Sequence, residues 1–282
     1  MTDHSKRLID MALEEDLGSG DVTSRYLIPA NCRASAFVAV RSAGIVSGID
    51  IAVRVFLAVD DSLEVEALIP DGNRVGVGAL LIRIEGSARS ILAAERTALN
   101  FLQRLSGIAT LTGAYVERVR GTQAAVLDTR KTIPGYRLLE KAAVLHGGGT
   151  NHRFGLFDRL MAKDNHLAAI AGKGLQSSID AAKSERPEVI IELEADNLDQ
   201  VREFLMLEGV DCILLDNMTP AEITSAIRMR GERTVPQFEA SGGVNLESIH
   251  EIALTGVEFI SVGAITHSAP ALDIGLDFEI LP

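Results

Sequence analysis

A stretch of 39 residues, 128–166, concentrates side chains that can bind an anion. It carries seven Lys and Arg against four Asp and Glu, together with three of the chain's six histidines. An arginine presents a planar fork that matches a carboxylate through two parallel hydrogen bonds, and a lysine adds a point charge. The pattern predicts a pocket for a ligand with several carboxylates. The basic residues are Arg130, Lys131, Arg137, Lys141, Arg153, Arg159 and Lys163.

These basic residues differ in what precedes them along the chain. Arg130 and Lys131 follow closely on the apolar run "AAVL", and Arg153 follows His152 and the glycines of "GGGT". Polar residues directly after apolar strands face the ligand in β/α barrels, so these side chains are predicted to do the same. Lys163, after "RLMA", is placed with them. Most Lys and Arg are exposed in proteins, and three of the seven are therefore interpreted as solvated charges. They are Arg137, Lys141 and Arg159.

The chain as a whole is acidic, with 27 Lys+Arg against 39 Asp+Glu and a formal charge of −12 over 282 residues. Nucleic acids and anionic membranes bind extended basic faces, so neither is expected as a partner and a small anion is favoured. The N-terminal residues lack a basic region that leads into an apolar segment, and no later window holds the roughly 18 apolar residues of a membrane span. These features predict a cytoplasmic protein.

Two carboxylates lie at the ends of consecutive predicted strands. Glu194 closes "VIIELEA" and Asp216 closes "DCILLDN". Neighbouring carboxylates suit Mg²⁺, which takes one or two protein carboxylates plus substrate phosphate oxygens. Glu192 lies two residues before Glu194, on the same side of the strand but one layer deeper, and the strand-end position favours Glu194 as the ligand. The two carboxylates can alternatively act as acid and base, or neutralise nearby bases.

Glycine-containing segments end the last two predicted strands, "ASGG" at 240–243 and "SVGA" at 261–264. Backbone N–H groups at this place commonly hold a phosphate in β/α barrels, and glycine permits close approach. His267 can assist a phosphate or cap a turn. A cradle for a terminal phosphate beside a metal-binding pair for a diphosphate describes a site for phosphoribosyl pyrophosphate. The candidate phosphate residues are Ser241, Gly242, Gly243, Gly263, Ala264 and His267.

The elements that must position these residues fall into two parts. In the first part, residues 5–17 place apolar side chains on one helical face, and short β-rich pieces alternate with glycines from about residue 34 to residue 85. Helical periodicity then runs from 87 to 120, with a break expected at Gly107. The first part is therefore predicted to be a helix, an antiparallel sheet and a long linking helix.

In the second part, after Gly121, apolar runs that end in polar or glycine residues alternate with helix-length stretches as far as residue 267. Thr219, followed by Pro220, is the predicted N-cap of one of these helices. Repeated strand-helix units predict a parallel sheet, and polar residues gathered at the strand ends predict a β/α barrel. The part is shorter than the ~250 residues of eight full units, so we expect an incomplete barrel.

Seven segments, taken in order, resemble those of the bacterial quinolinate phosphoribosyltransferase family, also called nicotinate-nucleotide pyrophosphorylase (carboxylating). They are "ERTALNFLQRLSGIAT", "DTRKTIPGYRLLEKAAV", "GGGTNHRFGL", "KDNH", "LLDN", "SGGV" and "VGAITHS...LDIGLDF". The resemblance covers nearly the whole chain. It implies an α/β protein with an N-terminal open α/β sandwich domain, residues 1–107 joined by 268–282, and an incomplete seven-stranded β/α barrel, residues 108–267. It also implies a homodimer or a larger assembly.

The resemblance implies transfer of phosphoribose from phosphoribosyl pyrophosphate to quinolinate with loss of CO₂, giving nicotinate mononucleotide and pyrophosphate in NAD biosynthesis. Lys131, Lys163, Glu194 and Asp216 match catalytic positions, and the two acids also match the ligands of Mg²⁺. Arg96, which helix periodicity alone predicts to be solvated, matches a residue that reaches the neighbouring subunit's site. The residues that match the quinolinate pocket are Arg96, Thr129, Arg130, Lys131, His152, Arg153 and Lys163. Those that match the phosphoribosyl pyrophosphate site are Glu194, Asp216, Ser241, Gly242, Gly243, Val262, Gly263, Ala264 and His267.

Three other interpretations remain open at this point. A phosphoribosyltransferase that acts on nicotinate or another aromatic acid would need fewer cations in the pocket. A barrel lyase would use Lys131 or Lys163 as a Schiff-base nucleophile. A non-catalytic anion-binding protein would bind its ligand without turnover, since a fold alone does not fix a function.

Arg130→Ala is expected to cripple turnover, because a charged hydrogen bond to a substrate carboxylate contributes roughly 1.5–3 kcal/mol. Arg137→Ala removes a predicted solvated charge and is expected to have a much smaller effect. Steady-state kinetics of both variants with quinolinate check this. Equal activities would contradict the assignment of Arg130.

Overall fold

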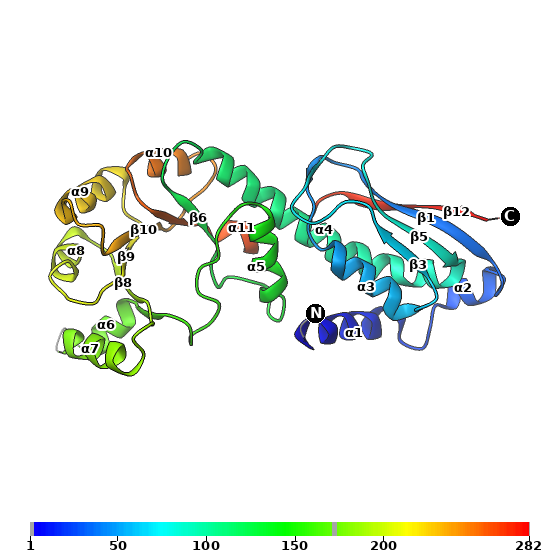
Figure 1. Cartoon of the computed structure of the whole chain (residues 1–282), viewed down its shortest axis with the longest axis horizontal. Coiled ribbons are helices and arrows are strands. Elements are labelled where there is room, and N and C mark those ends of the chain that lie inside the picture. The colour runs from blue at the N-terminus through cyan, green and yellow to red at the C-terminus, as the bar shows by residue number, and fades with distance from the viewer. Residues whose placement is uncertain (1–2, 171–173, 282) are drawn as a thin grey trace. The chain divides into compact units, whose positions relative to one another are not determined.

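The computed structural model describes residues 3–170 and 174–281. By compactness the chain divides into two units (Figure 1). Unit 1 comprises residues 1–113, 133–148 and 269–282, and unit 2 comprises residues 114–132 and 149–268. Both units combine helices with a sheet, as the α/β prediction requires.

Unit 1 is built on a four-stranded antiparallel sheet in the order β12-β1-β5-β3. The strand β1 (Arg33–Val40) pairs with β5 (Leu80–Ser87) on one side and with β12 (Ile274–Ile280) on the other. The edge strand β3 (Glu64–Ala67) pairs with β5, and the short strands β2 (Gly44–Ile45) and β4 (Arg74–Val75) pair separately. The last strand of the chain therefore completes a sheet that begins near its start.

Five helices belong wholly or largely to unit 1: α1 (Asp3–Leu17), α2 (Val22–Leu27), α3 (Ile49–Val59), α4 (Ala88–Arg118) and α5 (Arg137–His146). The predicted opening helix is confirmed by α1. The helix α3 packs against β3 and β5, and α1 packs against α3. Val38, Phe56 and Ile82 are fully or almost fully buried in this core.

Gly107 lies inside α4, which continues without interruption from Ala88 to Arg118, so the predicted helix break was wrong. A Cβ atom at Gly107 would lie 2.0 Å from the carbonyl oxygen of Pro270. The glycine is needed because the C-terminal segment passes against the helix backbone there. A single helical glycine costs only about 1 kcal/mol relative to alanine, which the surrounding helix tolerates.

The segment 133–148, expected within the barrel domain, groups with unit 1, and a buried ion pair joins it to α4. Glu140 on α5 is fully buried, and its Oε1 accepts a hydrogen bond from Nη2 of Arg104 on α4 at 2.7 Å. Its Oε2 accepts from the main-chain N–H of Ile133 at 3.2 Å. Arg104 also donates to the carbonyl oxygen of Ala269 at 3.1 Å. One guanidinium thus joins α4, α5 and the start of the C-terminal segment.

Unit 2 contains a six-stranded parallel sheet in the order β6-β11-β10-β9-β8-β7, with helices between the strands as predicted (Figure 1). The family resemblance implied seven strands, and the sheet of the described residues has six; Thr150 adds a single parallel bridge with Leu127 of β6. The strands are β6 (Ala125–Leu127), β7 (Leu160–Ala162), β8 (Ile191–Ala195), β9 (Cys212–Asp216), β10 (Gln237–Ser241) and β11 (Phe259–Ser261). The helices are α6 (Asp164–Ile170), α7 (Leu175–Glu185), α8 (Leu198–Phe204), α9 (Pro220–Arg230), α10 (Ile249–Leu254) and α11 (Ala264–His267).

The N-terminus of α9 confirms the predicted cap. The main-chain N–H of Glu222 donates to Thr219 Oγ1, and the Glu222 carboxylate accepts from the main-chain N–H of Thr219 at 2.8 Å. Pro220 fills the first helical position, where no N–H is required. Local sequence signals therefore determine where this helix begins.

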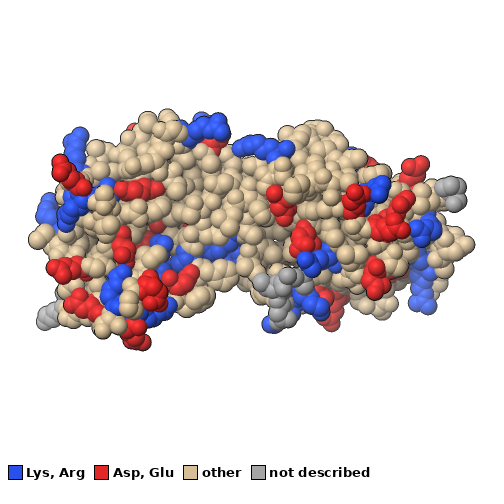
Figure 2. All heavy atoms as spheres, in the orientation of Figure 1, with Lys and Arg blue, Asp and Glu red and all other residues tan. Residues whose placement is uncertain are grey.

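Charged side chains of both signs are interspersed over the visible face of the molecule (Figure 2). Within residues 3–170 and 174–281, no helix combines the length and the apolar composition that a membrane crossing requires.

Glu140→Ala is expected to lower the free energy of unfolding by about 3–5 kcal/mol, because it removes the buried carboxylate that pairs with Arg104. The matched control is Asp10→Ala, which breaks an exposed ion pair with Lys6 one helical turn away and is expected to cost about 0.5 kcal/mol at most. Urea-induced unfolding of both variants measures the difference. Similar small losses would show that the pair does not hold the 133–148 segment in unit 1.

Candidate active site

One pocket of unit 2, with a volume of about 800 Å³, gathers most of the residues that the sequence predicted to bind a ligand. The side chain of Val262 is fully buried, and within the described residues it is not part of the pocket lining. Arg96 belongs to unit 1, where it is exposed on α4. The predicted residues that line the pocket are Thr129, Arg130, Lys131, His152, Arg153, Lys163, Glu194, Asp216, Ser241, Gly242, Gly243, Gly263, Ala264 and His267.

The strand ends bring these residues together. All strands of a parallel sheet direct their carboxyl ends to one edge, so residues distant in the sequence become neighbours there. The contributing positions are residues 129–131 after β6, Lys163 after β7, Glu194 on β8, Asp216 and Asn217 at the end of β9, residues 241–243 at the end of β10, and Gly263 after β11.

The basic side of the pocket brings two guanidinium groups close enough to affect each other. Burial lowers the pKa of Arg153, and the neighbouring charge of Arg130 lowers it further. Two cations held close together in a partly buried pocket repel one another, and an anion with two negative charges relieves that repulsion. This arrangement suits a dicarboxylate.

The acidic side of the pocket is formed by Glu194 and Asp216. Glu194 is 8% exposed, and one of its oxygens pairs with the ammonium of Lys163. Asp216 accepts a hydrogen bond from the side-chain amide of Asn217 at 2.6 Å. Both carboxylates are therefore oriented by a neighbouring side chain, and both offer only oxygen atoms as ligands for a metal ion.

Glu194 lines the pocket, whereas Glu192 is fully buried, and its Oε2 accepts a hydrogen bond from Nη1 of Arg159 at 2.8 Å. The interpretation of Arg159 as a solvated charge was wrong, because the side chain is only 17% exposed and is paired with this carboxylate. The same interpretation was wrong for Lys141, which is 3% exposed. Arg137 is half-buried.

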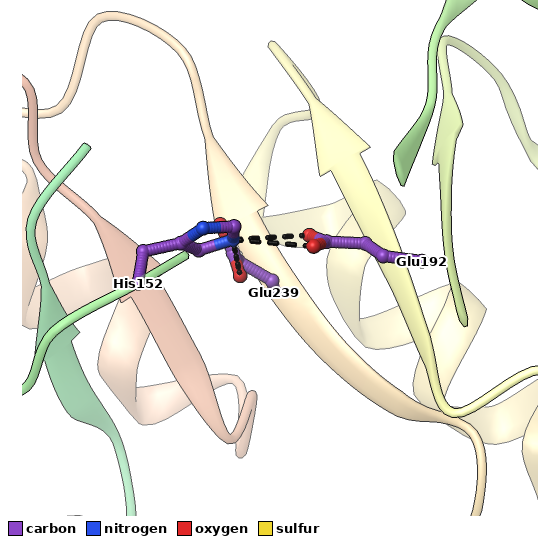
Figure 3. A group of neighbouring side chains, drawn as sticks. All are labelled: His152, Glu192 and Glu239. Atoms are coloured by element: carbon purple, nitrogen blue, oxygen red, sulfur yellow. Dashed lines mark hydrogen bonds and ion pairs between the residues drawn. The ribbon is translucent and has the colours of Figure 1, made fainter. Parts of the chain in front are cut away.

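A buried polar cluster of His152, Glu192, Glu239 and Arg159 adjoins the pocket (Figure 3). The imidazole Nε2 of His152 lies 3.2 Å from Oε2 of Glu192 and 3.2 Å from Oε2 of Glu239. Figure 3 shows the ring facing both carboxylates. The side chains of both glutamates are at most 1% exposed. The charges of this cluster are therefore neutralised by side chains of unit 2.

The pKa values of His152 and Glu239 depend on each other and on Glu192. Burial favours the neutral ring, but the hydrogen bonds to Glu192 and Glu239 outweigh it and raise the pKa of His152 to about 9. Burial, followed by the charge of Glu192, raises the pKa of Glu239. Interacting groups titrate together, so both pKa shifts belong to the cluster as a whole. The main-chain N–H of Arg153 donates to Nδ1 of His152 at 2.7 Å.

The glycine loop after β10 is shaped by contact with the neighbouring strand end. Gly242 has a φ of +96°, and a Cβ there would lie 2.2 Å from Oδ1 of Asn217. Asn217 itself has a φ of +54°, a conformation that asparagine tolerates better than most residues. Gly243 also has a positive φ, +60°, but a Cβ there would meet no atom within 4 Å. The close approach therefore restricts Gly242 more than Gly243.

Sequence reasoning missed Asn217, Glu239 and Arg159. Asn217 directly follows Asp216 in the motif "LLDN", which was a usable signal. Glu239 lies two residues before Ser241, on the same side of the strand, and is a charge inside an apolar run. The sequence around Arg159 carries no comparable signal, because its partner Glu192 is 33 residues away.

Two family models match this chain in succession. The one described as "Quinolinate phosphoribosyl transferase, N-terminal domain" matches residues 21–106, and the one for the C-terminal domain matches residues 108–277. The chain belongs to the quinolinate phosphoribosyltransferase family. This confirms the family assignment made from the sequence motifs, and it places the chain among the phosphoribosyl-transferring enzymes.

Relatives of known name cover almost the full chain. The quinolinate phosphoribosyltransferase (decarboxylating) 2, mitochondrial, of Nicotiana glauca is 42% identical over 289 residues, covering 97% of this chain and 82% of the relative. The nicotinate-nucleotide pyrophosphorylase (carboxylating) of Mycobacterium leprae is 41% identical, covering 98% and 97%. The crystal structure of NadC from Streptococcus pyogenes superposes with a TM-score of 0.92 at 37% identity and covers 100% of both chains. The fold of this quinolinate phosphoribosyltransferase family member is therefore shared along its whole length.

Gly242→Ala is expected to lower the free energy of unfolding by more than about 3 kcal/mol, because backbone strain of about 1–3 kcal/mol adds to a clash with Asn217. Gly243→Ala has the strain without the clash and is expected to cost about 1–2 kcal/mol. Urea-induced unfolding of the two variants tests this order. A larger loss for Gly243→Ala would contradict the close approach of Gly242 to Asn217.

Proposed function

We propose that the pocket of unit 2 transfers the phosphoribosyl group of phosphoribosyl pyrophosphate to quinolinate with loss of CO₂, forming nicotinate mononucleotide and pyrophosphate for NAD biosynthesis. The observation that supports this most strongly is the joint lining of one pocket by paired arginines, two strand-end carboxylates and the glycine loop after β10. The family to which the chain belongs and the printed names of its relatives agree with this chemistry.

The basic side would bind quinolinate through its two adjacent carboxylates. Arg130 and Arg153 provide the planar forks, and Lys131 and Lys163 provide point charges. Thr129 and His152 complete this side of the lining. The two arginines repel each other in the free enzyme, and a bound dianion relieves this repulsion more fully than a monoanion does. The pocket should therefore bind quinolinate more tightly than a monocarboxylate such as nicotinate.

The glycine side would hold the phosphate of phosphoribosyl pyrophosphate. Gly242 and Gly243 leave the main chain after β10 unobstructed by side chains, and Ser241 adds a hydroxyl. A Cβ at Gly263 would lie 3.1 Å from Nε2 of His267 and 3.2 Å from Cδ of Lys131. The absence of a side chain there lets these two basic residues approach the same place. Ala264 joins this lining, and Val262 supports it from a buried position.

Glu194 and Asp216 would hold Mg²⁺. The donor set fits, because Mg²⁺ prefers carboxylate oxygens and commonly takes one or two of them plus substrate oxygens. When bound, the ion would neutralise negative charge on the diphosphate. Asn217 orients the Asp216 carboxylate through a hydrogen bond of 2.6 Å, and Lys163 contacts Glu194, so this lysine stands where the two substrate regions meet.

The chemistry requires positioning and charge, and no covalent enzyme intermediate. The ring nitrogen of quinolinate forms a bond to ribose C1 as the bond from C1 to pyrophosphate breaks, and pyrophosphate leaves with that electron pair. Lys131 and Lys163 would stabilise the negative charge that develops on the leaving group. The nitrogen then carries a positive charge, which stabilises the carbanion left on the adjacent carbon when its carboxylate departs as CO₂. A proton takes the place of CO₂ on that carbon.

Arg96 would complete the pocket of a neighbouring subunit in a homodimer or larger assembly. It is exposed on α4 of unit 1, so its side chain is accessible to a second copy of the chain. Lys163 is engaged in an ion pair with Glu194, which supports a binding role for this lysine over that of a Schiff-base nucleophile.

The purified protein should form nicotinate mononucleotide from quinolinate, phosphoribosyl pyrophosphate and Mg²⁺, and a chelator should abolish product formation. A parallel reaction with nicotinate in place of quinolinate is expected to give no product, because it lacks the second carboxylate. Chromatography of the mononucleotide product measures both. Product from nicotinate alone would contradict the assignment of quinolinate as the substrate. Absence of product from both compounds would contradict the proposed function.

A further inference from the structure

The buried cluster, of which His152 and Glu239 also line the pocket, contains three residues that the proposed reaction does not use: Glu192, Glu239 and Arg159. Glu192 and Glu239 are 0% and 1% exposed, and the side chain of Arg159 is 17% exposed. Burying charge in unit 2 is costly unless each group is paired and hydrogen-bonded. A buried ion pair seldom adds net stability over an apolar replacement, so its presence calls for another explanation.

The cluster acts on one pocket residue, His152, from two sides. Its Nε2 lies 3.2 Å from a carboxylate oxygen of Glu192 and 3.2 Å from one of Glu239 (Figure 3). Its Nδ1 accepts the main-chain N–H of Arg153 at 2.7 Å. Both ring nitrogens are therefore engaged within the protein, and rotation of the ring would break contacts on both sides.

The main chain at this place is fixed by a further contact. The N–H of His152 donates to Oδ1 of Asp128 at 2.8 Å, and Asp128 is fully buried directly after β6. His152 is thus held through its main chain by β6 and through its ring by β8 and β10. The next residue is Arg153, which lines the pocket together with Arg130.

Each carboxylate of the cluster is in turn held by a second partner. Arg159 donates to Oε2 of Glu192 at 2.8 Å, and Ser261 Oγ donates to Oε1 of Glu239 at 2.5 Å. Ser261 belongs to β11, so the cluster links three strands of the sheet to the 152–153 segment.

A divalent cation is the rival occupant of this cluster. His152, Glu192 and Glu239 have ligand atoms within 4.8 Å of one another, which is the composition of a metal site. Arg159 argues against it, because its Nη1 lies 2.8 Å from Glu192 and 3.2 Å from Nε2 of His152. A guanidinium in that place already supplies the positive charge, and a metal ion there would be repelled by it.

We propose that Glu192, Glu239 and Arg159 are positioning residues that fix His152, and through it the main chain of Arg153, so that the Arg153 guanidinium faces the carboxylates of the substrate. The proposal rests on the proposed function for the identity of that substrate. It predicts that the cluster determines the affinity for the dicarboxylate without affecting the phosphate end of the pocket.

The test compares Glu239→Gln with Glu258→Gln. The first keeps the shape and the contact with Ser261 but alters the carboxylate near His152. The control alters another largely buried pair in unit 2, between Glu258 and Arg230 at 2.8 Å, whose members are not among the described residues that line the pocket. Glu239→Gln is expected to raise KM for quinolinate roughly tenfold to a hundredfold, the effect of about one charged hydrogen bond. KM for phosphoribosyl pyrophosphate should change by less than about threefold, and the control should leave both constants unchanged.

Equal changes of both KM values in Glu239→Gln, or no change, would overturn the positioning role. Arg159→Lys should retain more quinolinate affinity than Arg159→Met, and equal losses would also contradict it. Stoichiometric Zn²⁺ or Mn²⁺ binding that disappears in Glu239→Gln would instead make the cluster a metal site. If Glu239→Gln does not fold, Ser261→Ala removes the hydroxyl that holds Glu239, and the same split between the two KM values is expected.

The wild-type protein is assayed first, so that the two proposals can fail separately. Absence of turnover would overturn the proposed function alone. The positioning role is then measured by calorimetric titration with quinolinate, in which Glu239→Gln should weaken binding and Glu258→Gln should not. Equal dissociation constants for the wild type and Glu239→Gln would overturn the positioning role.

Discussion

Side chains alternate between the two faces of a β-strand, and this alternation arranges the charges of unit 2 in two levels. Glu192 and Glu194 share one side of β8, and Glu239 and Ser241 share one side of β10. Glu194 and Ser241 line the pocket at the strand ends. Of the deeper members, Glu192 is fully buried and lies outside the lining, whereas Glu239 is 1% exposed and still belongs to the lining. A pocket for anions therefore lies next to buried acids, and those acids must be neutralised from within the same unit.

This requirement makes the pocket and the core of unit 2 depend on the same side chains. His152 lines the pocket, and its Nε2 also lies within ion-pair distance of both buried acids. In an ordinary apolar core, the side chains beneath a binding site can change in concert if their total volume is kept. Here a change at one buried acid alters the charge balance around the histidine, so the chemistry of the pocket limits which residues the core can contain.

The sequence predicted what depends on local rules, and it failed where distant segments meet. Strand-end positions identified Arg130, Glu194 and Asp216 as pocket residues, because the carboxyl ends of parallel strands converge regardless of the loops between them. The cap at Thr219 followed from residues adjacent in sequence. Gly107 was misinterpreted because its reason is the approach of Pro270, more than 160 residues later. The prediction that Arg159 is solvated was wrong for a similar reason. The average exposure of arginines does not reveal that one of them has a buried partner distant in the sequence.

The antiparallel pairing of β12 with β1 has a consequence for the order in which the chain can fold. The whole of unit 2 lies in the sequence between the strands that form the sheet of unit 1. During synthesis β1 remains an unpaired edge on one side until β12 leaves the ribosome, and every strand of unit 2 precedes β12 in the sequence. Unit 2 can therefore complete its sheet first, and unit 1, although it begins the chain, is the unit that finishes last.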